Sequence, residues 1–337
     1  MAKVLHVEDL HVSFQVAGGE VQAVRGVTFT LNKRETLAIV GESGSGKSVT
    51  ALSILGLIPS PPGRIKQGKI RFGERDLTRL PEKEWYRIRG SEIGMIFQDP
   101  MTSLNPTMTI GKQIMEGIRW HRRAGWCEAF QKAVEILKLV GIPHPEKRMK
   151  QYPHEFSGGM RQRVVIAIAL ACFPKILIAD EPTTALDVTI QAQILDLMKE
   201  IQRQTGTSIL MITHDLGVVA ETADRVAVMY GGQIVEIGWV HEIFASPRHP
   251  YTRGLMGSIP CLDKAKDQAL EPIPGSPPDL FLPPPGCLFA DRCPYAMNVC
   301  YEEMPETTHV SGFHQVRCWL EDPEAPPVFP KILPEKS

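Results

Sequence analysis

The segment GESGSGKS at residues 41–48 constrains the fold of this chain more than any other stretch. It fits the pattern G-x-x-x-x-G-K-[S/T], which forms a phosphate-binding loop where a strand precedes it and a helix follows it. The apolar run ETLAIV (35–40) predicts a buried strand, and VTALSILGLI (49–58), which stops before Pro59, predicts a helix. The sequence therefore predicts an α/β fold with a nucleotide-phosphate site.

The chemistry of this loop is anion capture. Glycines let successive backbone N–H groups turn toward phosphate oxygens, and the following helix contributes the positive end of its dipole. Lys47 would reach the β- and γ-phosphates of a nucleotide, and the Ser48 hydroxyl would coordinate Mg²⁺. The residues expected to bind nucleotide here are Gly41, Ser43, Gly44, Ser45, Gly46, Lys47, Ser48 and Val49.

Length and charge limit the other functional classes. At 337 residues the chain is too long for one compact core, so a large domain with an extension, or two domains, is expected. The 37 basic and 38 acidic residues balance, which gives no broad basic field for nucleic acid, and we interpret RWHRR (119–123) as a solvated helix face. The N-terminus lacks a signal-peptide pattern, and the longest apolar run (164–172) is far shorter than the about 18 residues of a membrane span. Any role at a membrane is expected to depend on partners.

The stretch before the loop predicts a β-rich layer, because residues 4–14 and 24–31 have the pattern of strands. Phe14, at the end of the first of these, either stacks on an adenine ring or is a core residue. Another strand and turn are predicted in 68–77. EIGMIFQDP (92–100) is predicted to be a short apolar strand that ends in the polar Gln98.

Residues 109–140 change to helical spacing, and we interpret them as a helical insertion. The insertion runs into YPHEFSGGMRQR (152–163) and then into a helix over RVVIAIALAC. Ser157 would cap that helix, and Gly158 and Gly159 would leave its first N–H groups open to an anion. An ordinary capped helix would show the same pattern.

KILIADEPTTALD (175–187) carries the second group of chemically active residues. Its continuous apolar run predicts a central parallel strand, so Asp180 and Glu181 fall at the carboxyl end, where α/β sheets bind ligands. Two adjacent carboxylates there suit metal and water chemistry. SILMIT (208–213) predicts the next strand, and His214 stands at its edge.

From about residue 260 the composition changes. IPGSPPDLFLPPPG (273–286) is proline-rich and predicts neither a helix nor a central strand. Seven cysteines without a secretory signal indicate a reducing compartment, where disulfides are not expected. Four of the seven follow the proline-rich stretch, namely Cys287, Cys293, Cys300 and Cys318.

Taken in order, these motifs resemble those of the ATP-binding subunits of ABC transporters. The resemblance assigns 41–48 to Walker A, Gln98 to the glutamine loop, FSGGM (156–160) to the signature, ILIAD with Glu181 to Walker B, ALD (185–187) to the D-loop and His214 to the switch histidine. The signature usually reads LSGGQ, and here Phe156 and Met160 replace Leu and Gln while Ser-Gly-Gly is intact.

The resemblance implies a P-loop NTPase ABC cassette over residues 1–260, with a RecA-like core, an N-terminal antiparallel β layer and a helical subdomain at about 100–165. A small Cys/Pro-rich C-terminal extension would occupy residues 261–337. FQDPMTSLNP (97–106), SPRHPYTRGL (246–255) and the cysteine-bearing tail are similar to the dipeptide/oligopeptide/nickel import branch. This implies an ATPase that powers uptake of dipeptides or oligopeptides, with nickel or another small solute as the alternative cargo.

By the same resemblance each site residue has an expected role. Lys47 and Ser48 bind phosphates and Mg²⁺, Asp180 holds the metal, Glu181 orients or deprotonates the attacking water, His214 contacts the γ-phosphate, and Gln98 links metal and water to the transport partner. Ser157, Gly158 and Gly159 would complete the nucleotide site of a partner subunit. The expected partners are a second homologous ATPase in a heterodimer, two transmembrane permease subunits and an extracytoplasmic substrate-binding protein, with no nucleic acid. The expected location is the cytoplasmic face of the inner membrane.

The four tail cysteines predict a metal centre. Intervals of five, six and seventeen residues are looser than the C-x-x-C pairs common in zinc sites, and Pro294 directly after Cys293 is typical of some ferredoxin sites. Similarity to peptide-importer tails adds to this. We expect a [4Fe–4S] cluster, with zinc as the next alternative and unligated or disulfide-bonded cysteines as the last.

Two other functions remain to be compared with transport. A soluble ABC ATPase acting on DNA or ribosomes usually has two cassettes or long coiled-coil insertions, and the sequence shows neither. A regulatory module in which ATP is only structural is disfavoured by the intact Asp180, Glu181 and His214.

Overall fold

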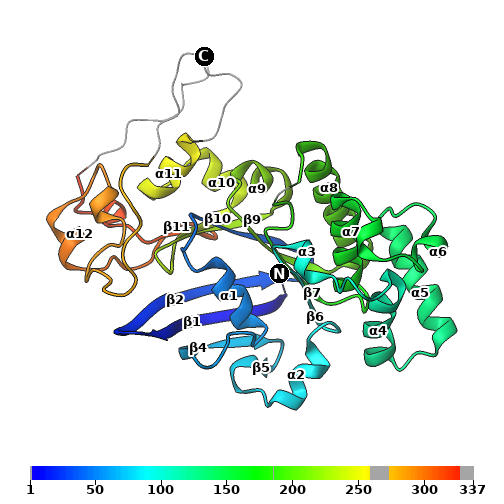
Figure 1. Cartoon of the computed structure of the whole chain (residues 1–337). Coiled ribbons are helices and arrows are strands. Elements are labelled where there is room, and N and C mark those ends of the chain that lie inside the picture. Colours follow the sequence, from blue (N-terminus) through cyan, green and yellow to red (C-terminus); the bar gives the residue numbers. More distant parts are fainter. Residues whose placement is uncertain (1, 185, 259–272, 327–337) are drawn as a thin grey trace, which may run out of the picture.

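The computed structural model describes residues 2–184, 186–258 and 273–326, and places two sheets side by side with helices around them (Figure 1). One is an antiparallel sheet with the strand order β2-β1-β4-β5. The other has the order β11-β12-β10-β9-β3-β8-β7-β6 and is parallel from β9 to β6. The strands are β1 (Lys3–Val16), β2 (Gly19–Asn32), β3 (Thr36–Val40), β4 (Gly63–Phe72), β5 (Arg75–Asp76), β6 (Ile93–Ile96), β7 (Ile176–Asp180), β8 (Ser208–Thr213), β9 (Arg225–Tyr230), β10 (Gln233–Trp239), β11 (Thr308–Ser311) and β12 (His314–Val316).

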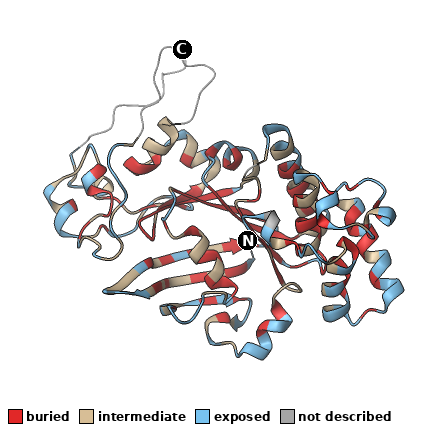
Figure 2. Ribbon diagram, viewed as in Figure 1, coloured by how far each residue is buried: buried red, intermediate tan, exposed pale blue. Residues whose placement is uncertain are grey.

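The central strands are buried because helices and the second sheet cover both faces of the parallel sheet (Figure 2). Every residue of β3, β7 and β8 is buried. This confirms the strands predicted from ETLAIV, ILIAD and SILMIT. Because the strands are parallel, the segments that follow β3, β6, β7 and β8 meet at one edge of the sheet.

The helices cover the sheet and form a separate bundle at one end of the molecule (Figure 1). They are α1 (Lys47–Ile54), α2 (Glu82–Ile88), α3 (Pro100–Ser103), α4 (Ile110–Arg122), α5 (Trp126–Leu139), α6 (Pro145–Arg148), α7 (Gly158–Ala169), α8 (Val188–Thr205), α9 (Leu216–Thr222), α10 (Val240–Ala245), α11 (Pro250–Gly257) and α12 (Asn298–Glu302). Among these described helices, none combines the length and apolar character needed to cross a bilayer.

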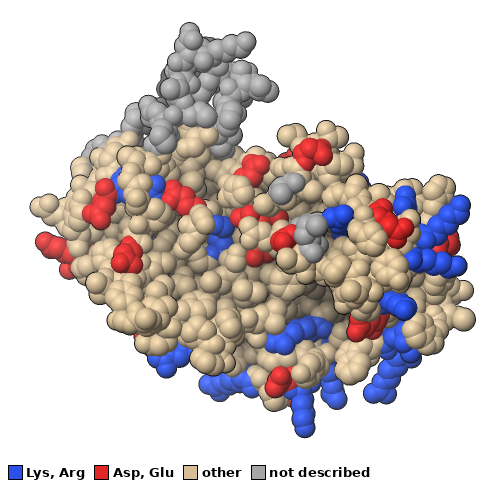
Figure 3. Space-filling view, viewed as in Figure 1, with Lys and Arg blue, Asp and Glu red and all other residues tan. Residues whose placement is uncertain are grey.

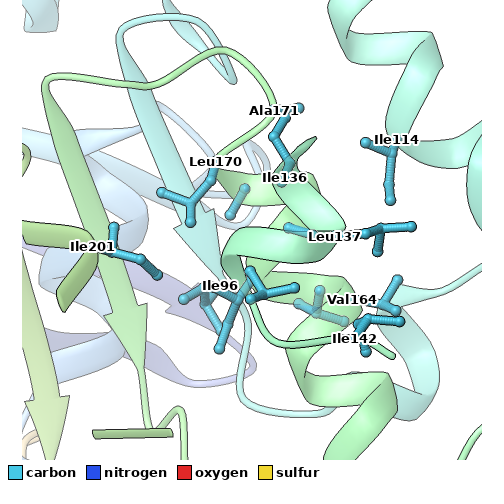
Figure 4. Close-up of a cluster of buried hydrophobic side chains, with 14 of the residues drawn as sticks. Ile96, Ile114, Ile136, Leu137, Ile142, Val164, Leu170, Ala171 and Ile201 are labelled. Atoms are coloured by element: carbon cyan, nitrogen blue, oxygen red, sulfur yellow. The ribbon is translucent and has the colours of Figure 1, made fainter. Parts of the chain in front are cut away.

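The helical bundle has an apolar core, formed by α4, α5 and α7, which continues onto one face of the main sheet and onto α8 (Figure 4). Ile110, Ile114 and Ile118 repeat at every fourth position of α4 and are fully buried, as are Ala133 and Leu137 of α5. This spacing places the apolar side chains on one face of each helix. The helical character predicted for residues 109–140 is therefore confirmed.

Two predicted helix ends were wrong by a few residues. The helix after the phosphate loop ends at Ile54 and not at residue 58, because Gly56 adopts a positive φ of 60° and ends the helical path. The helix predicted through residue 172 ends at Ala169. Its start agrees with the prediction, since Ser157 is the N-cap and accepts a hydrogen bond from the backbone N–H of Met160.

The described part of the C-terminal region returns to the main sheet. Strand β12 pairs antiparallel with β10, where Ile237 lies opposite Gln315. The ring of Phe289 packs against Tyr230 and Tyr251, with ring centroids 5.3 and 5.4 Å apart. Residues 273–286 form neither helix nor strand, as their proline content predicts.

Candidate functional site

The phosphate loop connects the carboxyl end of β3 to the N-terminus of α1. Gly46 is the N-cap of α1 with φ of 97°, and a Cβ at this position would lie 2.4 Å from the Ala23 carbonyl oxygen. At Gly44, in contrast, a Cβ would meet no atom within 4 Å. The loop is thus tightly packed at its base and open at its tip, where Ser43 and Gly44 are exposed.

Lys47 points back into the loop. Its Nζ donates hydrogen bonds to the carbonyl oxygens of Gly41 (2.7 Å) and Glu42 (2.8 Å), and lies 3.5 Å from the hydroxyl of Ser45. Burial lowers the pKa of Lys47, while the carboxylates around it oppose this shift. The ammonium group is therefore held at the centre of the loop, where phosphate oxygens would compete with the carbonyls.

Ser48 and Asp180 form the pair expected to hold a divalent cation. The Ser48 hydroxyl donates to Oδ1 of Asp180 at 3.1 Å. Burial raises the pKa of Asp180 above its usual range, Glu181 adds to this, and the Ser48 hydrogen bond and Lys47 oppose it. Hydroxyl and carboxylate oxygens are the ligands that Mg²⁺ prefers, so these residues fit the ion.

Glu181 is the centre of a second hydrogen-bonded group. Its Oε2 accepts from the side chains of Gln98 (3.0 Å) and Thr184 (2.8 Å), and its Oε1 lies 3.2 Å from Nδ1 of His214. Burial tends to raise the pKa of Glu181, but the bonds to Thr184 and His214 and the charge of Lys47 outweigh it and hold the pKa below its usual range. Glu181 is therefore an ionised hydrogen-bond acceptor with a fixed orientation.

The backbone of Glu181 is also constrained, since its φ is 47° in a non-glycine residue. Such a left-handed conformation persists where the surroundings enforce it, and it is enriched at functional sites. The sequence placed Gln98, Glu181 and His214 at three different strand ends, and the structure brings all three together. Gln98 contacts Glu181 directly.

The glycine-rich N-terminus of α7 packs against α8. Gly159 packs closely on α8, where a Cβ would lie 2.8 Å from Cγ2 of Ile190, whereas Gly158 has open space. Gln162 of the same helix donates to the Pro182 carbonyl at 2.6 Å. That bond connects the Ser157–Gly159 segment to the residue directly after Glu181.

Phe14 lies near the end of β1 and is partly buried against the core between the two sheets. Its ring edge occupies the space beside Gly63, where a Cβ would lie 2.7 Å from Cε1 of the ring. The stacking role stays a prediction.

The four tail cysteines are free thiols in one small region. Burial raises the pKa of Cys287 to about 11 and that of Cys318 to about 12, and Cys293 and Cys300 add to both shifts. Within the described ranges, no three His, Cys, Asp or Glu side chains are grouped tightly enough to hold one metal ion. Cys261 and the D-loop residue Ala185 lie outside the described residues.

Sequence reasoning missed two sets of residues at the site. Thr184 follows Glu181 closely, and only the structure shows that its hydroxyl faces the carboxylate. Glu42, inside the phosphate loop, contacts Arg292 and Tyr251 through hydrogen bonds of 2.8 Å. No local pattern indicates these contacts, because they join segments more than 200 residues apart.

Two family models match the chain. One, described as ABC transporter, matches residues 24–184, and the other, described as oligopeptide/dipeptide transporter C-terminal region, matches residues 235–300. The second match begins at β10 and includes three of the four tail cysteines.

Curated relatives match almost the whole chain. An oligopeptide transport ATP-binding protein of Bacillus subtilis (strain 168) is 62% identical over 330 residues, which cover 98% of this chain and 92% of the relative. A dipeptide transport ATP-binding protein of the same organism is 60% identical, covering 96% and 97%. An oligopeptide transport ATP-binding protein of Salmonella typhimurium is 53% identical, covering 89% of each chain.

Solved structures agree with the fold. A dimeric ATP-binding cassette in a post-hydrolysis state, bound to ADP and Pi, has a TM-score of 0.63 and 26% identity, covering 70% of this chain and 98% of its own. A Clostridium perfringens protein described as part of an ABC transporter complex has a TM-score of 0.63 and 30% identity, covering 73% and 92%. With the phosphate loop, the carboxylate pair and His214 at one sheet edge, these matches show that the chain belongs to the ATP-binding subunits of ABC transporters, and that it is an ATPase of this family.

Proposed function

We propose that this chain hydrolyses ATP to power the import of dipeptides or oligopeptides through membrane permease subunits. The supporting observation is the match to peptide transport ATP-binding proteins over nearly the whole chain, which includes the C-terminal region as well as the cassette. Import of nickel or another small solute is the alternative within the same branch.

In this proposal some residues of the site bind the nucleotide and others take part in its hydrolysis. The loop amides from Gly41 to Val49, with Lys47, would hold the phosphates, and Ser48 and Asp180 would hold Mg²⁺, which would supply positive charge to the phosphates. Glu181 orients the attacking water and accepts its proton. His214 stabilises charge on the γ-phosphate, and Gln98 connects this group to the transport partner. The short bonds around Glu181 support these roles, because they fix the carboxylate in one direction.

The partners follow from the transporter assignment. An ABC transporter ATPase works as a dimer with permease subunits. We propose that here the second ATPase is a homologous chain whose site Ser157, Gly158 and Gly159 complete, and that a substrate-binding protein delivers the cargo. The chain would lie at the cytoplasmic face of the inner membrane, held there by the permeases. We also propose that the ATPase cassette ends at about residue 260 and that residues 261–337 form a separate C-terminal extension.

The helical subdomain at about 100–165 is the proposed permease-facing part. It carries the exposed aromatic residues Trp120 and Trp126, of which 70% and 59% is accessible. These rings line a groove of about 380 Å³ together with Met115 and Arg119. On the face drawn in Figure 3, Lys and Arg gather along the lower and right-hand edges, and the bundle forms the right-hand edge. Cysteines placed within residues 101–115 are expected to crosslink to permease loops, and a functional complex that gives no crosslink would contradict this contact.

Transport is tested by placing the complete complex in vesicles with ATP on the side of this subunit. Wild-type complex is expected to accumulate labelled dipeptide or oligopeptide, and Glu181→Gln is expected to bind ATP but lose about 10²–10⁴-fold in hydrolysis and uptake. Accumulation of Ni²⁺ without peptide would replace the peptide assignment with the nickel one. Near wild-type hydrolysis by Glu181→Gln would show that another group accepts the proton.

We further propose that Cys287, Cys293, Cys300 and Cys318 hold a [4Fe–4S] cluster. Four free thiols whose charges influence one another supply the required ligands. A cubane binds each thiolate through a different iron, so its ligands lie farther apart than the four ligands of one zinc ion. Among the described residues no three such side chains are close enough to hold one ion, so the proposal rests on the number of free thiols and on their spacing in the sequence.

The cluster is tested on protein purified without oxygen. The expected preparation is brown, absorbs broadly near about 400 nm and contains about four irons per chain. Cys293→Ser should lose the colour, while the matched replacement Cys127→Ser, at an exposed cysteine of the helical subdomain, should keep it. A colourless preparation with one zinc and no iron would decide for the alternative.

A further inference from the structure

Glu42 connects the phosphate loop to the C-terminal region through its carboxylate, and its backbone groups are bonded as well. Its carboxylate accepts two parallel hydrogen bonds from the Arg292 guanidinium, Nη1–Oε2 at 2.8 Å and Nη2–Oε1 at 3.1 Å. Its N–H donates to the hydroxyl of Tyr251 at 2.8 Å, and its carbonyl accepts from Nζ of Lys47 at 2.8 Å. A single residue, Glu42, therefore connects the guanidinium of Arg292 to the ammonium group of Lys47.

Arg292 is held in one orientation by groups other than Glu42. Its Nε donates to the Pro274 carbonyl at 2.8 Å and its Nη2 to the Ile273 carbonyl at 3.2 Å. Nη1 also donates to the hydroxyl of Tyr230, whose position is fixed at the end of β9. The side chain is 5% exposed. A buried guanidinium with every edge occupied presents a rigid fork, which suits the planar carboxylate better than a flexible ammonium would.

We propose that Arg292 is a positioning residue for ATP binding, which acts through Glu42 to set the direction of the first loop amides and of Lys47. The C-terminal region would then form part of the nucleotide site through Arg292, which contacts the phosphate loop through Glu42. Arg292 also directly precedes Cys293, so the cysteine-bearing segment carries the residue that holds the loop.

The simpler explanation is that the ion pair only attaches the C-terminal region to the cassette. A second ion pair between the same two regions allows an experiment to distinguish the two explanations. Arg248 and Glu321 also join the cassette to the C-terminal region, at 3.7 Å, and among the described interactions neither side chain bonds to the phosphate loop. If attachment alone matters, losing either pair should have similar effects.

The experiment measures the affinity of the full chain for ATP with Mg²⁺, together with thermal unfolding. Arg292→Met and Glu42→Gln are each expected to weaken ATP binding about tenfold, which corresponds to about 1.4 kcal/mol. Arg292→Lys should give an intermediate loss, because it keeps the charge without the fork. The control Glu321→Gln should stay within about twofold of wild type, as expected of a partly exposed pair.

The double variant Arg292→Met/Glu42→Gln decides whether the two residues act as one unit. If Arg292 acts through Glu42, the double variant should bind ATP no more weakly than either single variant. Additive losses, wild-type affinity in Arg292→Met, or an equal loss in Glu321→Gln would each overturn the proposal. If Arg292→Met does not fold, Glu42→Gln and Arg292→Lys test the same bond from both sides.

Discussion

Replacing Thr184 with valine tests whether the orientation of Glu181 limits hydrolysis. Valine has nearly the shape of threonine but lacks the hydroxyl that donates to Oε2 of Glu181 at 2.8 Å. The change leaves the phosphate loop and the metal pair untouched. Its effect should therefore appear in the rate of hydrolysis and not in the affinity for ATP.

The size of the effect follows from the environment of the carboxylate. A hydrogen bond to a charged group contributes about 1.5–3 kcal/mol. Glu181 is 17% exposed and keeps its contacts with Gln98 and His214, so the lower end applies. Because a loss of about 1.4 kcal/mol lowers a rate tenfold, Thr184→Val should hydrolyse ATP about tenfold more slowly than wild type. The hydroxyl also favours the ionised form and lowers the pKa of Glu181, so its removal should move the acid limb of the pH–rate profile to higher pH.

The assay measures ATP turnover at saturating ATP in the assembled transporter, over a range of pH, and ATP affinity separately. Thr184→Ser should restore most of the rate, since it keeps a hydroxyl. Thr183→Val, the same replacement one residue earlier, should have little effect, because among the described interactions the Thr183 side chain makes no bond to Glu181. If Thr184→Val and Thr183→Val hydrolyse ATP at the same rate with the same acid limb, the orientation argument fails.

Other parts of the structure give three further predictions. Leu137→Ala should lower the free energy of unfolding by about 2–5 kcal/mol in urea titrations, because the side chain is fully buried in the helical bundle, and unchanged stability would contradict that packing. Gly46→Ala should abolish nucleotide binding in fluorescence titrations, since its Cβ would lie 2.4 Å from a backbone oxygen at a φ of 97°, and retained binding would show that the loop can rearrange. At pH 8, after removal of metal by a chelator, maleimide should label the exposed Cys127 at least about 100-fold faster than Cys287, because the pKa of Cys287 is raised to about 11 and few of its thiols are ionised. Peptide mapping measures the two rates, and equal rates would contradict the burial of Cys287.

Much of this fold could be predicted from the sequence because its signals are local. The buried strands β3, β7 and β8 are continuous apolar runs, and each is followed directly by a residue of the site. Parallel pairing then brings those ends to one edge, so the meeting of Glu181 and His214 followed from two predicted strands. The amphipathic spacing of residues 109–140 likewise predicted the helices of the insertion.

The remaining features depend on contacts between distant segments. Nothing near Glu42 in the sequence distinguishes it from other variable positions of the loop, and its partner Arg292 lies in a different region. The first helix ends at Ile54 because of the backbone conformation of Gly56. The apolar pattern continues to residue 58 and therefore predicted a longer helix. The direction of the Thr184 hydroxyl is likewise set by the fold and not by its neighbours in the chain.

The pairing of β12 with β10 has a consequence for synthesis on the ribosome. The partner of β10 emerges roughly 75 residues after it, which takes about 4–15 s at the usual pace of about 5–20 residues per second. During this interval the nascent sheet has an open edge with unpaired N–H and C=O groups, which can pair with other nascent chains. The last strands of the described chain, β11 and β12, therefore close an edge that is open to mispairing for as long as they are still being synthesised.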